Sequence, residues 1–340
     1  MTMPTATPSP TPSIADRVRA IETGDAVVAA TFLGAVPMFV LGEGELLFAS
    51  EDAPRRVTAH RGGVILCAAS DGERLLTGGD DGRVVETAAD GTPREMFAAG
   101  KAWVDTVALG PNGARAWSSG RIVTVDLGKE NLGKERKTLQ APSTPGGLAF
   151  APKGLRLAVS HYNGVSLWFP NADSKPESLS WKGSHLPVMW SPDGRFVVTA
   201  MHEPQLHGWR VTDGANMRMS GYPSRVRQMS WTATGNGLAT AGADALIVWP
   251  FTGKDGPMGK EPAMFAPSPS RLCAVACHPK NEIVAVGDED GMVMLTRLSD
   301  GAEILVKRPG GGNVTALAWA KTGSTLLFGT EEGAAGVVTL

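Results

Sequence analysis

The feature that most constrains this 340-residue sequence is a unit that recurs about every forty residues. Each unit has a short apolar run, a polar turn and a second apolar run, as in VMWSPDGRFVVTA (residues 188–200). Seven copies are clear, and their turns are marked by Asp71, Asn112, Lys153, Asp193, Thr234, Lys280 and Thr322, at spacings of 41, 41, 40, 41, 46 and 42 residues. A fixed period of this length is typical of an array in which every unit forms one module.

Each unit is predicted to form four antiparallel strands. A third apolar run follows a tight turn, as in GVSLWF (164–169), and a more polar fourth run comes next, as in AEILVK (302–307). Four such strands form the meander of a propeller blade. Residues 27–50 look like an eighth, shorter copy. We therefore predict an all-β β-propeller of eight four-stranded blades, with seven as the alternative because the N-terminal copy is the least regular.

The last copy ends after three predicted strands. An unpaired outer edge would expose N–H and C=O groups, which favours aggregation. The segment IADRVRAI (14–21) is able to supply the missing strand, so we expect the N-terminal segment to close the ring. Residues 14–340 then form a single domain. Residues 1–13, which alternate Pro, Thr and Ser, are predicted to be a disordered tail.

Several of these motifs resemble those of the WD40-repeat family. They are the SPDG turn, Asp-Gly or Asn-Gly before the third strand (Asp81-Gly82, Asn163-Gly164, Asp290-Gly291), and tryptophans near its end (Trp168, Trp209, Trp249). The resemblance covers about residues 25–340 and implies a β-propeller that binds other proteins. The lean chain, with 6% aromatic residues, is similar to bacterial forms.

The sequence departs from the family pattern in two ways. The Gly-His dipeptide is missing, with only His60 and His185 near its place, and Trp-Asp does not occur. These departures predict that individual blades lack the usual polar network between loop and strand.

Composition argues against several classes of function. The formal net charge of −2 and a pI near 6.3 give no general attraction to nucleic acid or to an anionic membrane. No apolar run is long enough to span a bilayer.

The cysteines and the motifs indicate a reducing compartment and no catalysis. Cys67, Cys273 and Cys277 read as free thiols, which favours a reducing compartment. No nucleophile elbow, P-loop or dinucleotide motif is present. We expect a cytoplasmic, monomeric protein that is not an enzyme.

Histidines raise the alternative of a zinc site. In a WD40-like blade, the turn between the second and third strands opens on the same face as the link to the next blade, here called the top face. His161, His202 and Glu203 lie in such turns and His185 lies in such a link, so their side chains could complete a tetrahedral zinc site. The competing interpretation is that they are turn residues and structural hydrogen-bonding groups, with MHEP (201–204) serving as a turn.

The links that enter successive blades suggest a partner-binding rim on the top face. Arginine and aromatic residues are enriched at interaction hot spots, although an exposed arginine in a loop is often only solvated. The predicted binding residues are Arg61, Trp103, His185, Tyr222, Arg225, Arg271 and Asn313. The insertion at 250–265 is a second candidate loop. The sequence thus predicts a non-catalytic scaffold that binds other proteins, with zinc binding or handling as the alternative.

Overall fold

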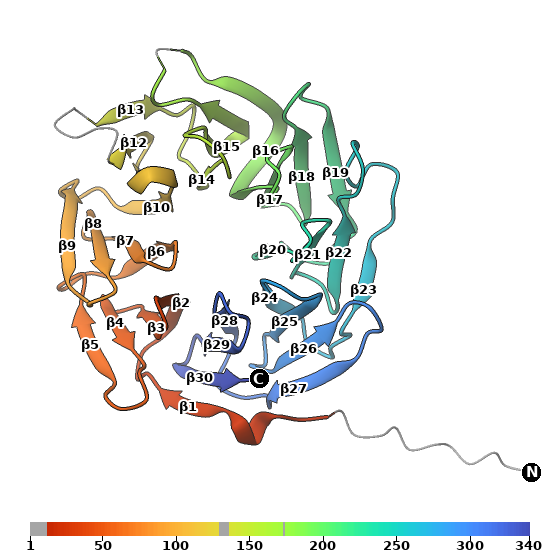
Figure 1. Cartoon of the computed structure of the whole chain (residues 1–340). Coiled ribbons are helices and arrows are strands. Elements are labelled where there is room, and N and C mark those ends of the chain that lie inside the picture. Colours follow the sequence, from red (N-terminus) through yellow and green to blue (C-terminus); the bar gives the residue numbers. More distant parts are fainter. Residues whose placement is uncertain (1–11, 129–135, 173) are drawn as a thin grey trace, which may run out of the picture.

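The strands are arranged radially around a central axis in the computed structural model, which describes residues 12–128, 136–172 and 174–340 (Figure 1). Within the described residues, neighbouring strands of each sheet pair antiparallel. The two short 3-10 helices of the described ranges are η1 (Ala15–Arg17) and η2 (Pro111–Gly113). No helix in these ranges is both long and apolar enough to cross a membrane.

Within the described residues the strands form seven sheets, six of four strands and one of six. The first three sheets follow one another along the chain. They are β2 (Val27–Leu33), β3 (Val36–Leu41), β4 (Glu45–Phe48) and β5 (Arg55–Thr58); β6 (Ile65–Ser70), β7 (Arg74–Gly79), β8 (Arg83–Ala88) and β9 (Pro93–Ala98); and β10 (Val104–Leu109), β11 (Arg115–Ser119), β12 (Ile122–Asp126) and β13 (Lys137–Gln140).

The six-stranded sheet comes next and is followed by two sheets of four. Its strands are β14 (Gly147–Phe150), β15 (Leu157–Trp168), β16 (Glu177–Trp190), β17 (Phe196–Met201), β18 (Gln205–Arg210) and β19 (Asn216–Ser220). The two others are β20 (Met229–Trp231), β21 (Gly237–Thr240), β22 (Leu246–Pro250) and β23 (Ala263–Phe265), then β24 (Leu272–Cys277), β25 (Ile283–Asp288), β26 (Val293–Arg297) and β27 (Glu303–Lys307).

The sheet count corrects our main prediction, because seven sheets match the alternative and eight separate four-stranded blades are not found. The reason lies in β15 and β16, which are 12 and 14 residues long. The first part of β16 pairs with β15, and its last part, His185 to Trp190, pairs with β17. Two neighbouring copies of the sequence repeat therefore share one continuous sheet.

The remaining sheet joins the two ends of the described chain, as predicted. It holds β28 (Val314–Trp319), β29 (Thr325–Thr330) and β30 (Ala334–Thr339), and its outer strand is β1 (Arg19–Glu22), which pairs with β30 from Arg19↔Val337 to Glu22↔Ala334 (Figure 1). The predicted disordered tail lies outside the described residues except for Pro12 and Ser13. The Leu305 N–H donates to Pro12 O at 2.8 Å, and the Ile14 N–H donates to Leu305 O at 2.9 Å.

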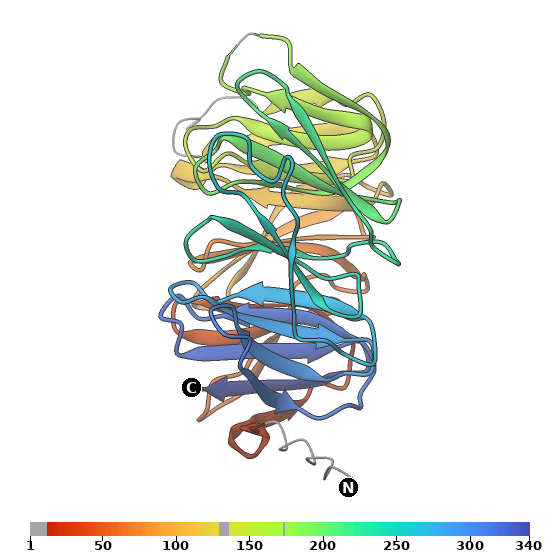
Figure 2. The same ribbon diagram turned by 90° about the vertical axis from the view of Figure 1, so that its right-hand side faces the viewer.

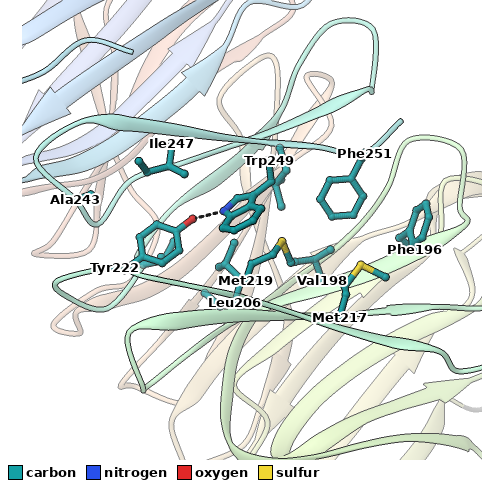
Figure 3. Close-up of a cluster of buried hydrophobic side chains, with 13 residues drawn as sticks. Phe196, Val198, Leu206, Met217, Met219, Tyr222, Ala243, Ile247, Trp249 and Phe251 are labelled. Atoms are coloured by element: carbon teal, nitrogen blue, oxygen red, sulfur yellow. Dashed lines mark hydrogen bonds between the residues drawn. The ribbon is translucent and has the colours of Figure 1, made fainter. Parts of the chain in front are cut away.

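Apolar clusters between neighbouring sheets form the core, because the sheets bury both faces. One cluster joins Phe196 and Met217 of the six-stranded sheet to Trp249 and Phe251 of the next sheet (Figure 3). Seen from the side, the sheets succeed one another around the ring, each with its neighbours on both faces (Figure 2). Contacts between sheets thus fix the positions of the loops on both faces of the ring.

Three sheets contain a buried polar network that the sequence departures led us not to expect. In each case a buried threonine of the second strand bonds to a side chain that lies before the inner strand or at its start. The pairs are His60 Nε2 with Thr77 Oγ1 at 2.9 Å, His185 Nδ1 with Thr199 Oγ1 at 2.7 Å, and Tyr222 OH with Thr240 Oγ1 at 2.7 Å. Asp81 lies 3.0 Å from His60 Nδ1 and extends the first network. Loop and strand are therefore tied together without the Gly-His dipeptide.

Candidate functional site

The two kinds of loop that were expected on one face do lie together. The backbone N–H of the turn between the second and third strands bonds to a carbonyl of the link in three sheets. Asp80 donates to Val64 at 3.1 Å, Glu289 to Arg271 at 3.0 Å, and Glu331 to Asn313 at 3.0 Å. We keep the name top face for this surface. The bottom face carries the turns between the first and second strands.

Five of the seven predicted binding residues lie at this surface. Trp103 is 58% exposed, and Arg61, Arg225 and Arg271 are also exposed. Asn313 is half-buried and its side-chain amide donates to Glu331 Oε2 at 2.8 Å. These predicted residues therefore place an exposed indole and three guanidinium groups on the top face.

His185 does not belong to the exposed rim, which corrects its assignment as a partner-binding residue. Its side chain is 1% exposed, Nδ1 faces Thr199 and Nε2 faces Trp181 O at 3.0 Å. Burial, together with nearby His161, lowers its pKa, while the Trp181 carbonyl and Glu203 act in the opposite direction. His185 is a structural hydrogen-bonding group.

Tyr222 is also buried, so it cannot meet a partner directly (Figure 3). Its hydroxyl accepts a hydrogen bond from Trp249 Nε1 at 2.7 Å and lies 2.7 Å from Thr240 Oγ1. Burial raises the pKa of this phenol to about 12. Tyr222 takes the place that histidine has in two other sheets, and it anchors the link that carries Arg225.

The predicted zinc ligands are not assembled as a metal site. His161 Nδ1 lies 2.8 Å from Tyr162 O and its Nε2 lies 3.0 Å from Ser166 Oγ, so both ring nitrogens face protein groups, as those of His185 do. His202 and Glu203 are exposed at the turn. Across the described ranges, no group of three or more His, Cys, Asp or Glu is placed to hold a metal ion. The structural interpretation of these histidines therefore fits the geometry better.

The thiols are placed as core groups. All three cysteines are free, and burial raises the pKa of each to about 12. Cys273 Sγ lies 3.1 Å from Val314 O, on the next inner strand. A thiol with a raised pKa is a poor nucleophile at neutral pH.

A small pocket on the top face combines predicted and unpredicted residues. It measures about 130 Å³ and lies between the links that enter β20 and β24. Its lining includes Ser224, Arg225, Arg227, Arg271, Cys273 and Glu289. Arg271 NH1 is 3.1 Å from Glu289 Oε1, whereas Arg225 and Arg227 form no ion pair with any residue in the described ranges. We name this site the arginine pocket.

Arg227 and Glu289 were missed as site residues. Arg227 lies in the segment 217–227 that leads into β20, where a second arginine two residues after Arg225 was a usable signal. Glu289 was hidden because an acidic residue before Asp-Gly reads as an ordinary turn residue.

A larger hollow than the arginine pocket lies on the bottom face between two sheets. It measures about 890 Å³ and is lined by residues that include Arg74, Arg94, Arg115 and Asp126. Glu86 joins Arg74 at 3.2 Å to Arg115 at 2.9 Å, and Arg115 reaches Asp126 at 3.4 Å. These charges neutralise one another and tie the two sheets together.

The insertion at 250–265 is bonded to the neighbouring sheet. Arg210 NH1 lies 2.6 Å from Asp255 Oδ1, and Arg195 NH1 donates to Gly253 O at 3.0 Å. Lys260 Nζ donates to Gly256 O at 2.8 Å within the loop. These contacts make the insertion a brace between sheets.

Two segments match family models. Residues 275–339 match the anaphase-promoting complex subunit 4 WD40 domain, and residues 53–85 match the WD domain, G-beta repeat. WD repeat-containing protein 1-B of Xenopus laevis is 30% identical over 144 residues, which is 40% of this chain and 24% of that protein. WD repeat-containing protein 1-A of the same species is 30% identical over 99 residues, or 28% of this chain and 16% of that protein.

The chain thus spans no more than about a quarter of the length of these curated relatives. Among solved structures, the crystal structure of the computationally designed Ika8 protein superposes with a TM-score of 0.74 at 18% identity. The alignment covers 94% of this chain and 98% of the designed one, and it shows the likeness of the fold alone. The bacterial style expected from the sequence stays a prediction. The two family models and the two relatives show that parts of this chain are similar to WD40-repeat proteins, and the ring of radial sheets agrees with that likeness.

Proposed function

We propose that this protein is a non-catalytic interaction platform that binds other proteins through its top face. The observation that carries the proposal is the exposed Trp103, at 58%, on the same face as Arg61, Arg225 and Arg271. Tryptophan and arginine are the residue types most enriched at binding hot spots. The contacts between sheets hold the links rigidly, so binding needs little ordering of the loops.

The proposal includes a monomeric ring in the cytoplasm, with proteins rather than nucleic acid or membranes as partners. It is supported by the near-neutral net charge and by the family, whose members are typically interaction scaffolds.

The test is a comparison of partners captured from the native cell. The triple variant Trp103→Ala, Arg225→Glu, Arg271→Glu removes the proposed anchors from the top face. Lys153→Glu makes a matched charge reversal at the exposed turn between β14 and β15 on the bottom face. We expect the triple variant to lose partners that the wild type and Lys153→Glu retain, by about 30-fold or more in affinity for a hot-spot cluster.

Circular dichroism must first show that both variants are folded. Partners that remain on the triple variant, or that are lost equally from Lys153→Glu, would contradict a top-face site.

A further inference from the structure

Equivalent positions in neighbouring sheets provide a comparison for the arginine pocket. Arg271 and Asn313 occupy equivalent places, each directly before a buried residue that begins an inner strand, Leu272 or Val314. In both sheets a glutamate of the nearest turn binds that residue. Glu289 lies 3.1 Å from Arg271, and Glu331 lies 2.8 Å from the Asn313 amide. A carboxylate is thus the native occupant next to this position.

Arg225 holds the same position one sheet earlier, before buried Val226, but its turn is built differently. Gly242, with a φ of +132°, donates to Leu272 O at 2.9 Å, and the Leu272 N–H donates to Ala243 O at 2.9 Å. The turn therefore bonds to the neighbouring sheet and brings no carboxylate to Arg225. A side chain at Gly242 would also meet Arg225 O at 3.2 Å.

The pocket consequently has an excess of positive charge. Three guanidinium groups line it, and Glu289 is the only acid among its lining residues. Asp244 is exposed farther along the same turn and forms no ion pair with a described residue. A guanidinium binds a carboxylate through two parallel hydrogen bonds, so a free Arg225 beside Arg227 is well suited to that group.

Size and surroundings favour a peptide side chain over other anions. A volume of about 130 Å³ is smaller than the cavities of roughly 300 Å³ or more that hold small-molecule ligands. The exposed carboxylates of Glu331 and Glu332 lie on the same face and would repel the continuous charge of a nucleic-acid backbone.

We infer that the arginine pocket binds a carboxylate side chain of an acidic peptide segment, and that Glu289 competes with that carboxylate for Arg271. The inference rests on the proposed function and specifies the chemistry of the partner. Arg225 and Arg227 hold the incoming carboxylate, and Arg271 is shared between it and Glu289.

Fluorescence anisotropy tests the inference with a labelled peptide of consecutive glutamates and its all-glutamine counterpart. We expect the glutamate peptide to bind and its affinity to fall with salt, because the site is exposed. Arg225→Gln should weaken binding about fivefold, and Glu289→Gln should strengthen it about twofold, the scale expected for exposed charge pairs. Lys153→Gln, an equal charge loss on the bottom face, should leave binding unchanged.

The opposite signs for Arg225→Gln and Glu289→Gln are the decisive readout, since a general loss of structure would weaken binding in both. Equal binding of the two peptides, or weaker binding by Glu289→Gln, would overturn the inference. So would competition by a single-stranded oligonucleotide as strong as that by the glutamate peptide. If native partners still depend on Trp103 and Arg225 in that event, the platform stands and only the acidic specificity falls.

Discussion

At the residue scale, His207 is the group whose environment is least compatible with charge. Its ring stacks on Trp181 with centroids 4.1 Å apart and meets Trp209 edge-on at 4.7 Å. Both ring nitrogens are buried and have no hydrogen-bond partner among the described residues. Burial first, then His185 and Arg218, lowers the pKa of His207 to about 3.

This pKa predicts a loss of stability in acid. A histidine in the unfolded chain has a pKa near 6.5, so it is protonated below that pH. In the folded protein His207 stays neutral until the pH approaches about 3. The stability contributed by neutral His207 is complete above pH 6.5 and decreases as the pH falls toward 3. The free energy of unfolding of His207→Phe, measured relative to that of wild type, should therefore increase by at least about 1 kcal/mol when the pH is lowered from 7 to 4.5.

Urea unfolding at the two pH values measures this difference. His202→Phe is the matched control, because His202 is exposed at the turn. A His207→Phe variant whose stability falls with acid as steeply as that of wild type would show that another group governs the transition.

Single residues were the least predictable level from sequence. The position of His185 was correctly found, but its role depends on Thr199, which lies fourteen residues away and meets it only in the folded sheet. Tyr222 was read as an exposed aromatic because nothing local shows that it replaces a histidine in the same network. Arg225 and Arg271 were correctly expected at the surface, because the exposure of an arginine in a link between strands can be inferred from the local sequence alone.

At the scale of elements, we expect the charge pairs that join two sheets to contribute more to the free energy of unfolding than exposed charges within one turn. Glu86 of β8 bridges Arg74 of β7 and Arg115 of β11, and its side chain is only 16% exposed. Glu86→Gln should leave two half-buried guanidinium groups without a shared carboxylate and cost about 2 kcal/mol of unfolding free energy.

Chemical denaturation of Glu86→Gln checks this value against Glu73→Gln. Glu73 is exposed at the edge of the same hollow and forms no ion pair within the described ranges, so its variant should change stability by less than about 0.5 kcal/mol. Similar losses in the two variants would mean that the bridge between the sheets adds nothing.

Strands were predicted well because the alternation of apolar and polar residues repeats in every copy. The number of sheets was not, since it depends on whether one strand stops before the next begins. From Glu177 to Trp190 the chain forms one strand, although this segment contains Gly183, with a φ of +117°, and Pro187. Sequence periodicity marks the repeat, but hydrogen bonding decides where a sheet ends.

At the scale of the whole molecule, ring closure depends on four residue pairs between β1 and β30. Deleting residues 1–22 should expose the outer edge of β30 and produce lower thermal stability and self-association. Deleting residues 1–13 keeps β1 and should leave the protein monomeric. Size-exclusion chromatography with light scattering distinguishes the two outcomes, and a monomeric, equally stable protein without residues 1–22 would show that closure is dispensable.

The antiparallel register of that closure also sets its response to force. The start of β1 lies opposite the end of β30, with Arg19 beside Val337, so tension on the two chain ends would load the outermost pair first. The bonds would then open one after another like a zipper, instead of all resisting together in shear. The pairing of β1 with β30 is thus expected to open at a lower force, when the chain ends are pulled apart, than a pairing of the same length loaded in shear.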